Sequence, residues 1–395
     1  MTILYHHRTR ATDAQRVHIR EIIQAFRKLG HQVEVAALMD AEKEQQDAAR
    51  EAEEAGWKKL ILRIPLAYEL VQLAYNFFAV PWLVWKILRT GTGLVYERYS
   101  LFNFAGVLAA RIARRPVVLE VNSPFALEQH QLKEIRAAAF AGWMERVICN
   151  AATKVIVVSG PLRRILLAGG VRDSKLVLMH NGVNLDHFRT AEDSQALRNS
   201  LQLEGKVVIG FAGWFRPWHG LEFLLESFHT AGLAKRGAAL LLIGDGPTTA
   251  GLKQYAAEHG LGECVVFTGP VPHEKIQPFL NIVDIAVQPA ANEYCCPMKI
   301  LEYMGLGKAI AAPRQENIEE LVADGREALL FSPGDAAGFA DILSRLVEDA
   351  ELRWRLGKGA LDAIHRRELL WTRNAGRVIE MVSAADGRRA VPVRV

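Results

Sequence analysis

The chain has 395 residues, half of which are apolar, and a formal net charge of +4. This length favours two domains over a single core, and so small a charge gives no indication of nucleic-acid binding, which usually shows a concentrated basic stripe. The four cysteines are too few and too scattered for a disulfide scaffold or a zinc site. We expect a cytoplasmic protein without a metal site or a cofactor, and residues 1–10 show no apolar core of signal-peptide length.

Stretches rich in β-branched and apolar residues alternate with amphipathic helical stretches along the chain. Five predicted strands lie in the first half, at 3–5, 32–37, 93–96, 117–121 and 154–158. Five more follow at 206–211, 239–243, 264–267, 285–288 and 309–311. The alternation is typical of parallel sheets with crossover helices, and two such series predict two Rossmann-like α/β domains. The number of predicted strands alone would also allow a single barrel.

An Asn-Gly pair at the start of 181–188 is a strong turn signal, and we place the hinge between the domains there. The predicted domains are an acceptor-side domain at 1–183 and a donor-binding domain at 184–370. Residues 371–395 are predicted to form a last helix, which contains Trp371, and a basic tail.

The stretch 60–88 is strongly apolar and aromatic, and it is long enough to raise the question of a membrane span. Charged residues interrupt it, and Pro65 and Pro81 break it. Three interpretations remain open: a pair of buried helices, an amphipathic surface that lies in the interface of an anionic membrane, and a true span. The residues that would meet the membrane interface are Phe77, Trp82, Trp85, Lys86 and Arg89.

The stretch 289–313 reads as a strand end, a loop, a helix that begins near Met298, and a further strand. A helix N-terminus at the carboxyl edge of a parallel sheet binds anions, because its backbone N–H groups and its dipole point outward. The amides of Met298 and Lys299, with the Lys299 ammonium, could hold a diphosphate. Glu302, one turn into the helix, could accept both hydroxyls of a ribose, or it is simply an acid on the helix surface.

The pattern Pro-x-Lys-x-x-Glu-Tyr-Met, followed by Gly-Lys and a strand at 297–310, resembles the donor-binding element of the family-4 retaining glycosyltransferases. Other stretches resemble that family in the same order and cover nearly the whole chain. They are Gly-His-x-Val at 30–33, Val-Ser at 158–159, Asn-Gly-Val at 181–183, Gly-x-Gly-Pro at 244–247, the nucleobase loop with Gly269 and Val271, and the element at 324–335.

The resemblance implies a GT-B fold, in which two Rossmann-like domains face a central cleft and the C-terminal helix returns to the first domain. It also implies retaining transfer of a sugar from a nucleotide-diphosphate sugar. Helix-end amides and basic side chains can neutralise the leaving group without a metal. The apolar stretch 60–88 favours a glycan or lipid-linked acceptor in polysaccharide biosynthesis, and a location on the inner face of the membrane.

The chain departs from the family pattern in the donor site. The family often has two acids eight positions apart; Glu302 takes the second place, but Tyr294 takes the first, with Glu293 beside it. In the loop that begins at Gly213 and neutralises the diphosphate, two basic residues are usual. There Trp214 replaces an arginine and His219 replaces a lysine, so Arg216 could supply the permanent charge and His219 a pH-dependent one.

The first domain departs from the pattern as well. Asn122 follows the strand at 117–121 where many relatives have a histidine, and an asparagine can bind a sugar hydroxyl but cannot carry a proton. Asp13-Ala14 replaces a glycine pair. Two groups of strand-end residues read equally well as site residues or as surface and ion-pair residues. They are His6, His7, Arg8 and Arg10 after the first strand, and Glu97, Arg98 and Glu120 after two later ones.

Three functional hypotheses follow. The first is a retaining glycosyltransferase; the others are another GT-B enzyme, such as a sugar-nucleotide epimerase or phosphorylase, and a non-catalytic glycosyltransferase-like partner or sugar-binding subunit. A dinucleotide oxidoreductase is disfavoured, because no strand runs into Gly-x-Gly-x-x-Gly. The catalytic candidates are Asn122, Arg216, His219 and Lys299, and the donor-binding candidates are Gly213, Gly269, Val271, Glu293, Tyr294, Met298, Lys299 and Glu302.

Overall fold

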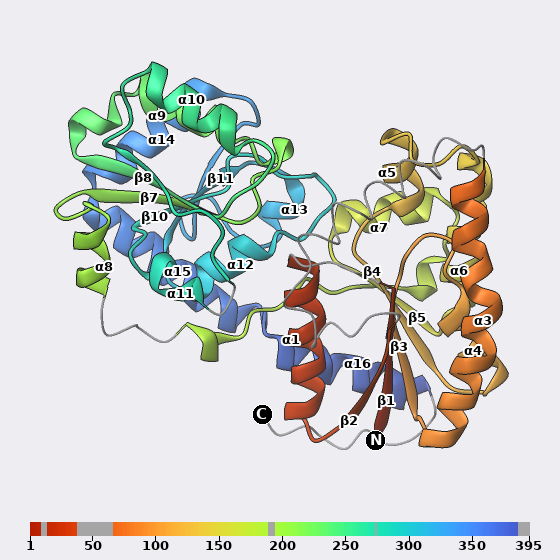
Figure 1. Cartoon of the computed structure of the whole chain (residues 1–395). Helices are drawn as coiled ribbons and strands as arrows, with labels where there is room; N and C mark the ends of the chain where they lie inside the picture. Colours follow the sequence, from red (N-terminus) through yellow and green to blue (C-terminus); the bar gives the residue numbers. More distant parts are fainter. Residues whose placement is uncertain (9–13, 38–65, 189–193, 273–274, 386–395) are drawn as a thin grey trace. The chain divides into compact units, whose positions relative to one another are not determined.

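The computed structural model describes residues 1–8, 14–37, 66–188, 194–272 and 275–385. These residues form two compact units (Figure 1). The first comprises Met1–His180 together with the C-terminal residues from Trp371, and the second comprises Asn181–Leu370. The second unit thus begins slightly before the boundary expected after residue 183. The Asn181 side chain donates to the carbonyl of Cys296, which explains the earlier boundary because Cys296 belongs to the second unit.

The first unit is built on a parallel sheet with strand order β2-β1-β3-β4-β5-β6. The inner strands are almost wholly buried, as expected for a parallel sheet that is covered on both faces. The strands are β1 (Thr2–His7), β2 (Gln32–Ala37), β3 (Leu94–Arg98), β4 (Val117–Val121), β5 (Lys154–Val157) and β6 (Leu176–Leu178).

Helices flank this sheet on both sides. They are α1 (Ala14–Lys28), α3 (Ala67–Thr90), α4 (Ala105–Ile112), α5 (Phe125–Gln131), α6 (Ala138–Ala151), α7 (Gly160–Ala168) and the C-terminal α16 (Trp371–Ala385). In Figure 1, α1 and α16 lie on one side of the sheet and α3 and α4 on the other. The Trp371 ring packs edge-on against His18 of α1, with 4.6 Å between ring centroids. This contact confirms that the last helix returns to the first domain.

The second unit has a parallel sheet with strand order β12-β11-β10-β7-β8-β9. Its strands are β7 (Val207–Ala212), β8 (Ala238–Ile243), β9 (Val265–Phe267), β10 (Ile285–Val287), β11 (Ala309–Pro313) and β12 (Leu329–Phe331). Its helices are α8 (Ser194–Ser200), α9 (Leu221–Thr230), α10 (Thr249–Glu258), α11 (Gln277–Asn281), α12 (Met298–Gly305), α13 (Glu316–Glu319), α14 (Ala336–Glu348) and α15 (Ala350–Arg366).

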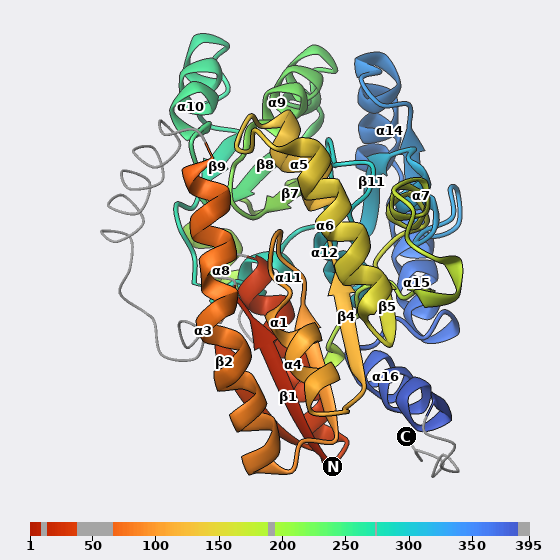
Figure 2. The same ribbon diagram turned by 90° about the vertical axis from the view of Figure 1, so that its right-hand side faces the viewer.

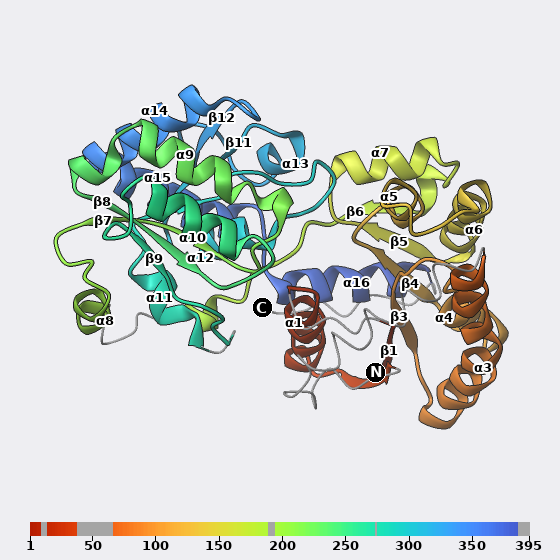
Figure 3. The same ribbon diagram turned by 45° about the horizontal axis from the view of Figure 1, so that its top comes forward.

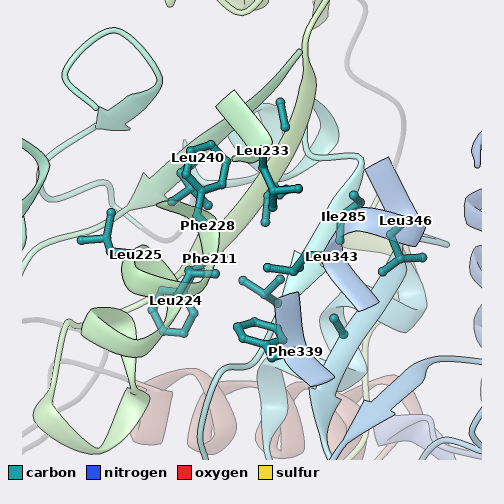
Figure 4. Close-up of a cluster of buried hydrophobic side chains, with 14 of the residues drawn as sticks. Phe211, Leu224, Leu225, Phe228, Leu233, Leu240, Ile285, Phe339, Leu343 and Leu346 are labelled. Atoms are coloured by element: carbon teal, nitrogen blue, oxygen red, sulfur yellow. The ribbon is translucent and has the colours of Figure 1, made fainter. Parts of the chain in front are cut away.

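Helices α9 and α14 belong to the second unit (Figure 3), and aliphatic and aromatic side chains fill the space between them and the sheet (Figure 4). Phe211, Leu240 and Ile285 come from three neighbouring strands, and they meet Phe228 of α9 and Leu343 of α14. All five side chains are fully buried. This core fixes β7 and β10, whose carboxyl ends carry the candidate donor site.

The two sheets confirm the predicted pair of Rossmann-like domains, and a single barrel is excluded. The prediction of two buried helices at 60–88 is wrong for the described part of that stretch, because α3 runs unbroken through Pro81 and exposes much of its apolar surface. Residues 60–65, Arg10, Asp13 and the predicted tail at 386–395 lie outside the described residues.

Candidate active site

Side-chain amides hold the loop before α12 in place. Since β7, β8 and β10 run parallel, the loops that follow them begin at one edge of the second sheet, and α12 starts at the end of the third loop. Four amide side chains donate hydrogen bonds of 2.5–3.2 Å to carbonyls of this loop. These are Gln288 to Ala290, Gln315 to Ala291, Asn317 to Asn292 and Cys295, and Asn181 to Cys296.

No family motif pointed to Gln315 or Asn317, and sequence reasoning missed both as residues that position the loop. A polar residue next to apolar ones can indicate a buried amide, and Asn317 is indeed buried, as is the neighbouring Ile318. Because buried amides need partners, such a residue generally holds a neighbouring backbone in place. Here the neighbouring backbone is the one that leads to the N-terminus of α12.

The Lys299 side chain crosses the loop after β7 at Gly213. A Cβ atom at this glycine would lie 2.6 Å from Lys299 Cε, and its φ of +143° is one that other residues rarely adopt. The Lys299 ammonium lies 5.2 Å from the centroid of the Phe211 ring and 3.5 Å from His219 Nε2. The structure thus brings Gly213, His219 and Lys299 together.

Burial, together with the nearby charges of Lys299 and Arg216, lowers the pKa of His219 from 6.5 to about 3, and the backbone of Trp214 opposes this shift. The histidine is therefore neutral near pH 7 in the ligand-free protein. This differs from the expected pH-dependent partner, because the sequence did not show that the imidazole would be buried and lie beside Lys299. The permanent positive charges are those of Lys299 and Arg216, whose guanidinium lies 5.0 Å from the centroid of the Trp218 ring.

The glycines of the Gly-x-Gly-Pro turn allow two backbones to touch. A Cβ atom at Gly244 would lie 2.1 Å from the carbonyl oxygen of Gly213, and one at Gly246 would lie 2.5 Å from Phe215 N. The N–H of Phe215 donates to the carbonyl of Asp245 at 2.7 Å. The turn after β8 therefore supports the loop that carries Arg216 and His219.

The remaining donor-site candidates lie in the same unit. Gly269 pairs with Gly244 in an isolated antiparallel bridge and has a φ of +71°. Glu302 lies one turn into α12 and is half-buried, whereas Glu293 is exposed. Val271, Tyr294 and Met298 are half-buried as well. The structure places all of them in unit 2, on α12 or in the loops after β9 and β10.

In the first unit, Asn122 belongs to a buried network around Glu120. Its amide donates to Glu120, which lies 2.9 Å from Arg98 Nη1 and 3.2 Å from His18 Nε2. Burial alone would raise the pKa of Glu120, but the charges of His18 and Arg98 and the hydrogen bonds from Tyr96 and Asn122 bring the pKa below its ordinary value. Arg98 and Glu120 are thus a structural ion pair, and one amide hydrogen of Asn122 is directed to it.

A second buried pair joins His6 to Glu97, with 2.7 Å between His6 Nδ1 and the carboxylate. His6 Nε2 lies 2.9 Å from the hydroxyl of Tyr75 on α3, and Arg8 stacks on the same ring at 4.3 Å from its centroid. His6 and His7 are both fully buried, so neither belongs to a solvated surface loop. Among the described residues, no group of three or more His, Cys, Asp and Glu side chains could hold a metal ion.

Comparison with known proteins agrees with this geometry. The family model described as "Glycosyl transferases group 1" matches residues 206–349, and the model described as "Glycosyltransferase Family 4" matches residues 15–187. The alpha-D-kanosaminyltransferase of Streptomyces kanamyceticus is 27% identical over 265 residues, which are 65% of this chain and 68% of that protein. The D-inositol 3-phosphate glycosyltransferase of Streptomyces avermitilis is 27% identical over 307 residues, which are 74% of this chain and 65% of that protein.

Solved structures show the same fold. HepE of Anabaena, solved in complex with UDP, matches with a TM-score of 0.73 and 20% identity, over 97% of this chain and 100% of that chain. The sucrose-phosphate synthase of Thermosynechococcus elongatus matches with a TM-score of 0.70 and 18% identity, over 98% of this chain and 100% of that chain. Both sequence models, the order of the motifs and the paired sheets lead to one conclusion. The chain belongs to the group 1 glycosyltransferases of family 4, retaining enzymes of GT-B fold that use a nucleotide-sugar donor.

Proposed function

We propose that this enzyme transfers a sugar from a UDP-sugar to a glycan or lipid-linked acceptor, without a metal ion, at the cytoplasmic face of a membrane. The observation that carries the proposal is the convergence of Lys299 and Arg216 with the neutral His219 beside the N-terminus of α12. The UDP found in the HepE complex supports the choice of nucleotide. The exposed apolar surface of α3 supports the membrane location and the lipid-linked acceptor.

In this proposal the donor diphosphate lies on the N-terminus of α12, and the ammonium of Lys299 and the guanidinium of Arg216 neutralise it. Such groups stabilise the charge that develops as the nucleoside diphosphate leaves. Glu302 accepts the ribose hydroxyls, and Gly269 and Val271 pack on the base. Glu293 and Tyr294 flank the sugar.

A thermal-shift screen of nucleotide sugars tests the donor. A ligand that binds only the folded protein stabilises it by about 2.7 kcal/mol when present at 100 times its Kd. We expect UDP-sugars to raise the melting temperature more than GDP-, ADP- or CMP-sugars at the same concentration. A selective shift with one of the other nucleotides would contradict the choice of UDP while leaving the family assignment intact.

We predict that Arg216→Ala weakens donor binding by roughly tenfold, because a hydrogen bond to a charged group contributes about 1.5–3 kcal/mol. Calorimetric titration of UDP measures the loss. Arg236→Ala is the matched control, since Arg236 pairs with Glu348 on the exposed surface of the same unit and should leave the Kd unchanged. Unchanged Kd and kcat for both Arg216→Ala and His219→Ala would place the diphosphate elsewhere.

We also predict that turnover persists in excess EDTA, because the basic side chains and helix amides already supply positive charge to the diphosphate. Initial rates measured with EDTA, and with Mg²⁺ or Mn²⁺ added back, should differ by less than about twofold, far below the effect of removing a transition-state interaction. Complete loss of activity that either metal reverses would show that the metal-free proposal is wrong.

A further inference from the structure

Helix α3 exposes one continuous apolar stripe to solvent. Phe77 and Phe78 are 77% and 80% exposed, which is unusual for large aromatic side chains at the centre of a helix. Residues Glu69–Thr90 are long and apolar enough to cross a membrane, and only 22% of this apolar stretch is buried inside the protein. The stripe recurs at helical spacing and contains Leu70, Val71, Phe77, Phe78, Trp82, Trp85 and Leu88.

The opposite side of α3 is bonded into the first unit. Asn76 donates to the carbonyl of Phe102 at 2.8 Å and accepts from the N–H of Phe104 at 2.9 Å. Near the start of the helix, the Glu69 carboxylate accepts from the N–H of Arg136 at 2.7 Å. Moving α3 into a bilayer as a span would leave these buried groups without partners, at a cost of several kcal/mol per group. The helix is therefore part of the fold, and only its outer face is available.

Neighbouring helices extend the apolar surface. Helix α4 packs on α3 and exposes Leu108 and Ile112. Helix α6, which begins next to the Glu69 contact, exposes further apolar side chains, and its Phe140 stacks on Phe102 with 6.0 Å between centroids. Figure 2 shows α3, α4 and α6 on the side of the first unit that faces the viewer. We call this surface the α3–α4–α6 face; α6 contributes Phe140, Trp143 and Val147 to it.

Among the described residues, most of the exposed charges that border this face are positive; the exposed Glu34 of β2 is neutralised by Lys86 of α3, 3.7 Å away. In 66–90, 105–115 and 132–151, Glu69 and Glu145 are buried and Glu134 is half-buried, so no acidic side chain there is exposed. The Arg89 guanidinium lies 4.9 Å from the centroid of the Trp85 ring, which pairs a cation with an interfacial aromatic side chain. The exposed basic residues of these segments are Arg89, Arg111, Arg114, Arg115, Lys133, Arg136 and Arg146.

We propose that the α3–α4–α6 face docks on the surface of a bilayer that contains anionic lipids. Apolar and aromatic side chains would enter the headgroup region, and the bordering arginines would contact lipid phosphates. The face is wider than the stretch 60–88, since α4 and α6 contribute to it. Docking is a property of the first unit and does not depend on donor binding in the second.

The docked helix is also tied to the carboxyl end of the first strand. Tyr75 in the first half of α3 lies 2.9 Å from His6 Nε2, and Arg8 covers its ring. Docking would therefore hold the carboxyl end of β1 close to the lipid surface. If the acceptor is lipid-linked, as proposed above, this arrangement supplies it at high local concentration.

Co-sedimentation with vesicles tests the proposal. The full chain should bind phosphatidylcholine vesicles that contain phosphatidylglycerol, and binding should weaken as salt is added. The double variants Trp82→Ser/Trp85→Ser and Ile112→Ser/Trp143→Ser should each lose about tenfold or more in binding, because each removes two large apolar side chains. Arg111→Gln/Arg114→Gln should lose roughly 30-fold, because each of the two cations contributes about 1 kcal/mol.

Trp354→Ser is the matched control, because Trp354 is an exposed tryptophan of the second unit with Lys358 over its ring, the same pairing as Trp85 with Arg89. It should bind vesicles like the wild type. Absence of wild-type binding, equal binding to pure phosphatidylcholine, or a stable dimer in solution that hides the face would overturn the proposal. Donor hydrolysis without vesicles, measured on the same samples, separates these outcomes from a failure of the enzymatic proposal.

Discussion

Replacing Lys299 by methionine is expected to lower kcat by about 10²- to 10³-fold, the loss typical of removing one group that stabilises charge in the transition state. The ammonium lies 3.5 Å from His219 and reaches this position by crossing Gly213. Methionine keeps an unbranched apolar stem over Gly213 and Phe211, so the loop should keep its conformation. Single-turnover kinetics would measure the chemical step. Lys358→Met, on the exposed surface of α15, is the matched control.

The same variant has a second readout that does not depend on activity. Lys299 is one of the charges that lower the pKa of His219 to about 3, so this pKa should rise in Lys299→Met. In the folded protein the pKa of His219 lies below its ordinary value of 6.5, so between about pH 3 and 6.5 this histidine is protonated in the unfolded chain but not in the folded one. The wild-type protein therefore loses stability as the pH falls through this range. That loss should shrink in the variant. A normal kcat with an unchanged His219 titration, followed by NMR, would remove Lys299 from the site.

The sequence predicted the sheets well because their strands are buried on both sides and read as apolar runs. β1, β7 and β8 are examples, and each was predicted to within a few residues. β6 and β12, with three residues each, were missed, whereas β9 and β10, which are equally short, were predicted. The helix N-terminus at Met298 could be predicted because a proline and a loop precede it.

What the sequence could not predict depends on which side chains meet. Glu97, Arg98 and Glu120 read equally well as site residues or as ion pairs, and only the structure shows them buried and paired. Pro81 was read as a helix break, yet α3 continues through it. A proline removes one hydrogen bond from a helix, and packing of α3 against α4 is sufficient to maintain the helix despite that loss.

Glu302→Gln is expected to weaken donor binding by roughly tenfold or more, since each charge-assisted hydrogen bond to a ribose hydroxyl contributes about 1.5–3 kcal/mol. Glu302 lies one turn into α12 and is half-buried, so its carboxylate can reach a nucleotide bound at the helix N-terminus. Its backbone carbonyl accepts from the N–H of Leu306, a bond that glutamine preserves, and the fold should remain intact. Calorimetric titration with UDP measures the loss, and titration with uracil, which lacks the ribose, shows whether it is specific.

Glu293→Gln distinguishes two registers of the donor loop. Glu293 is exposed and lies next to Tyr294, the position where the family often has its first acid. If Glu293 only flanks the site, its variant should lose less than about threefold in affinity for the sugar donor, because an exposed carboxylate contributes little. If the loop shifts by one residue when donor binds, Glu293 takes over the contact to the sugar, and its variant should lose affinity for the sugar donor but not for UDP. A Glu302→Gln protein that binds UDP as tightly as the wild type would remove the ribose contact from this site and move the nucleotide away from α12.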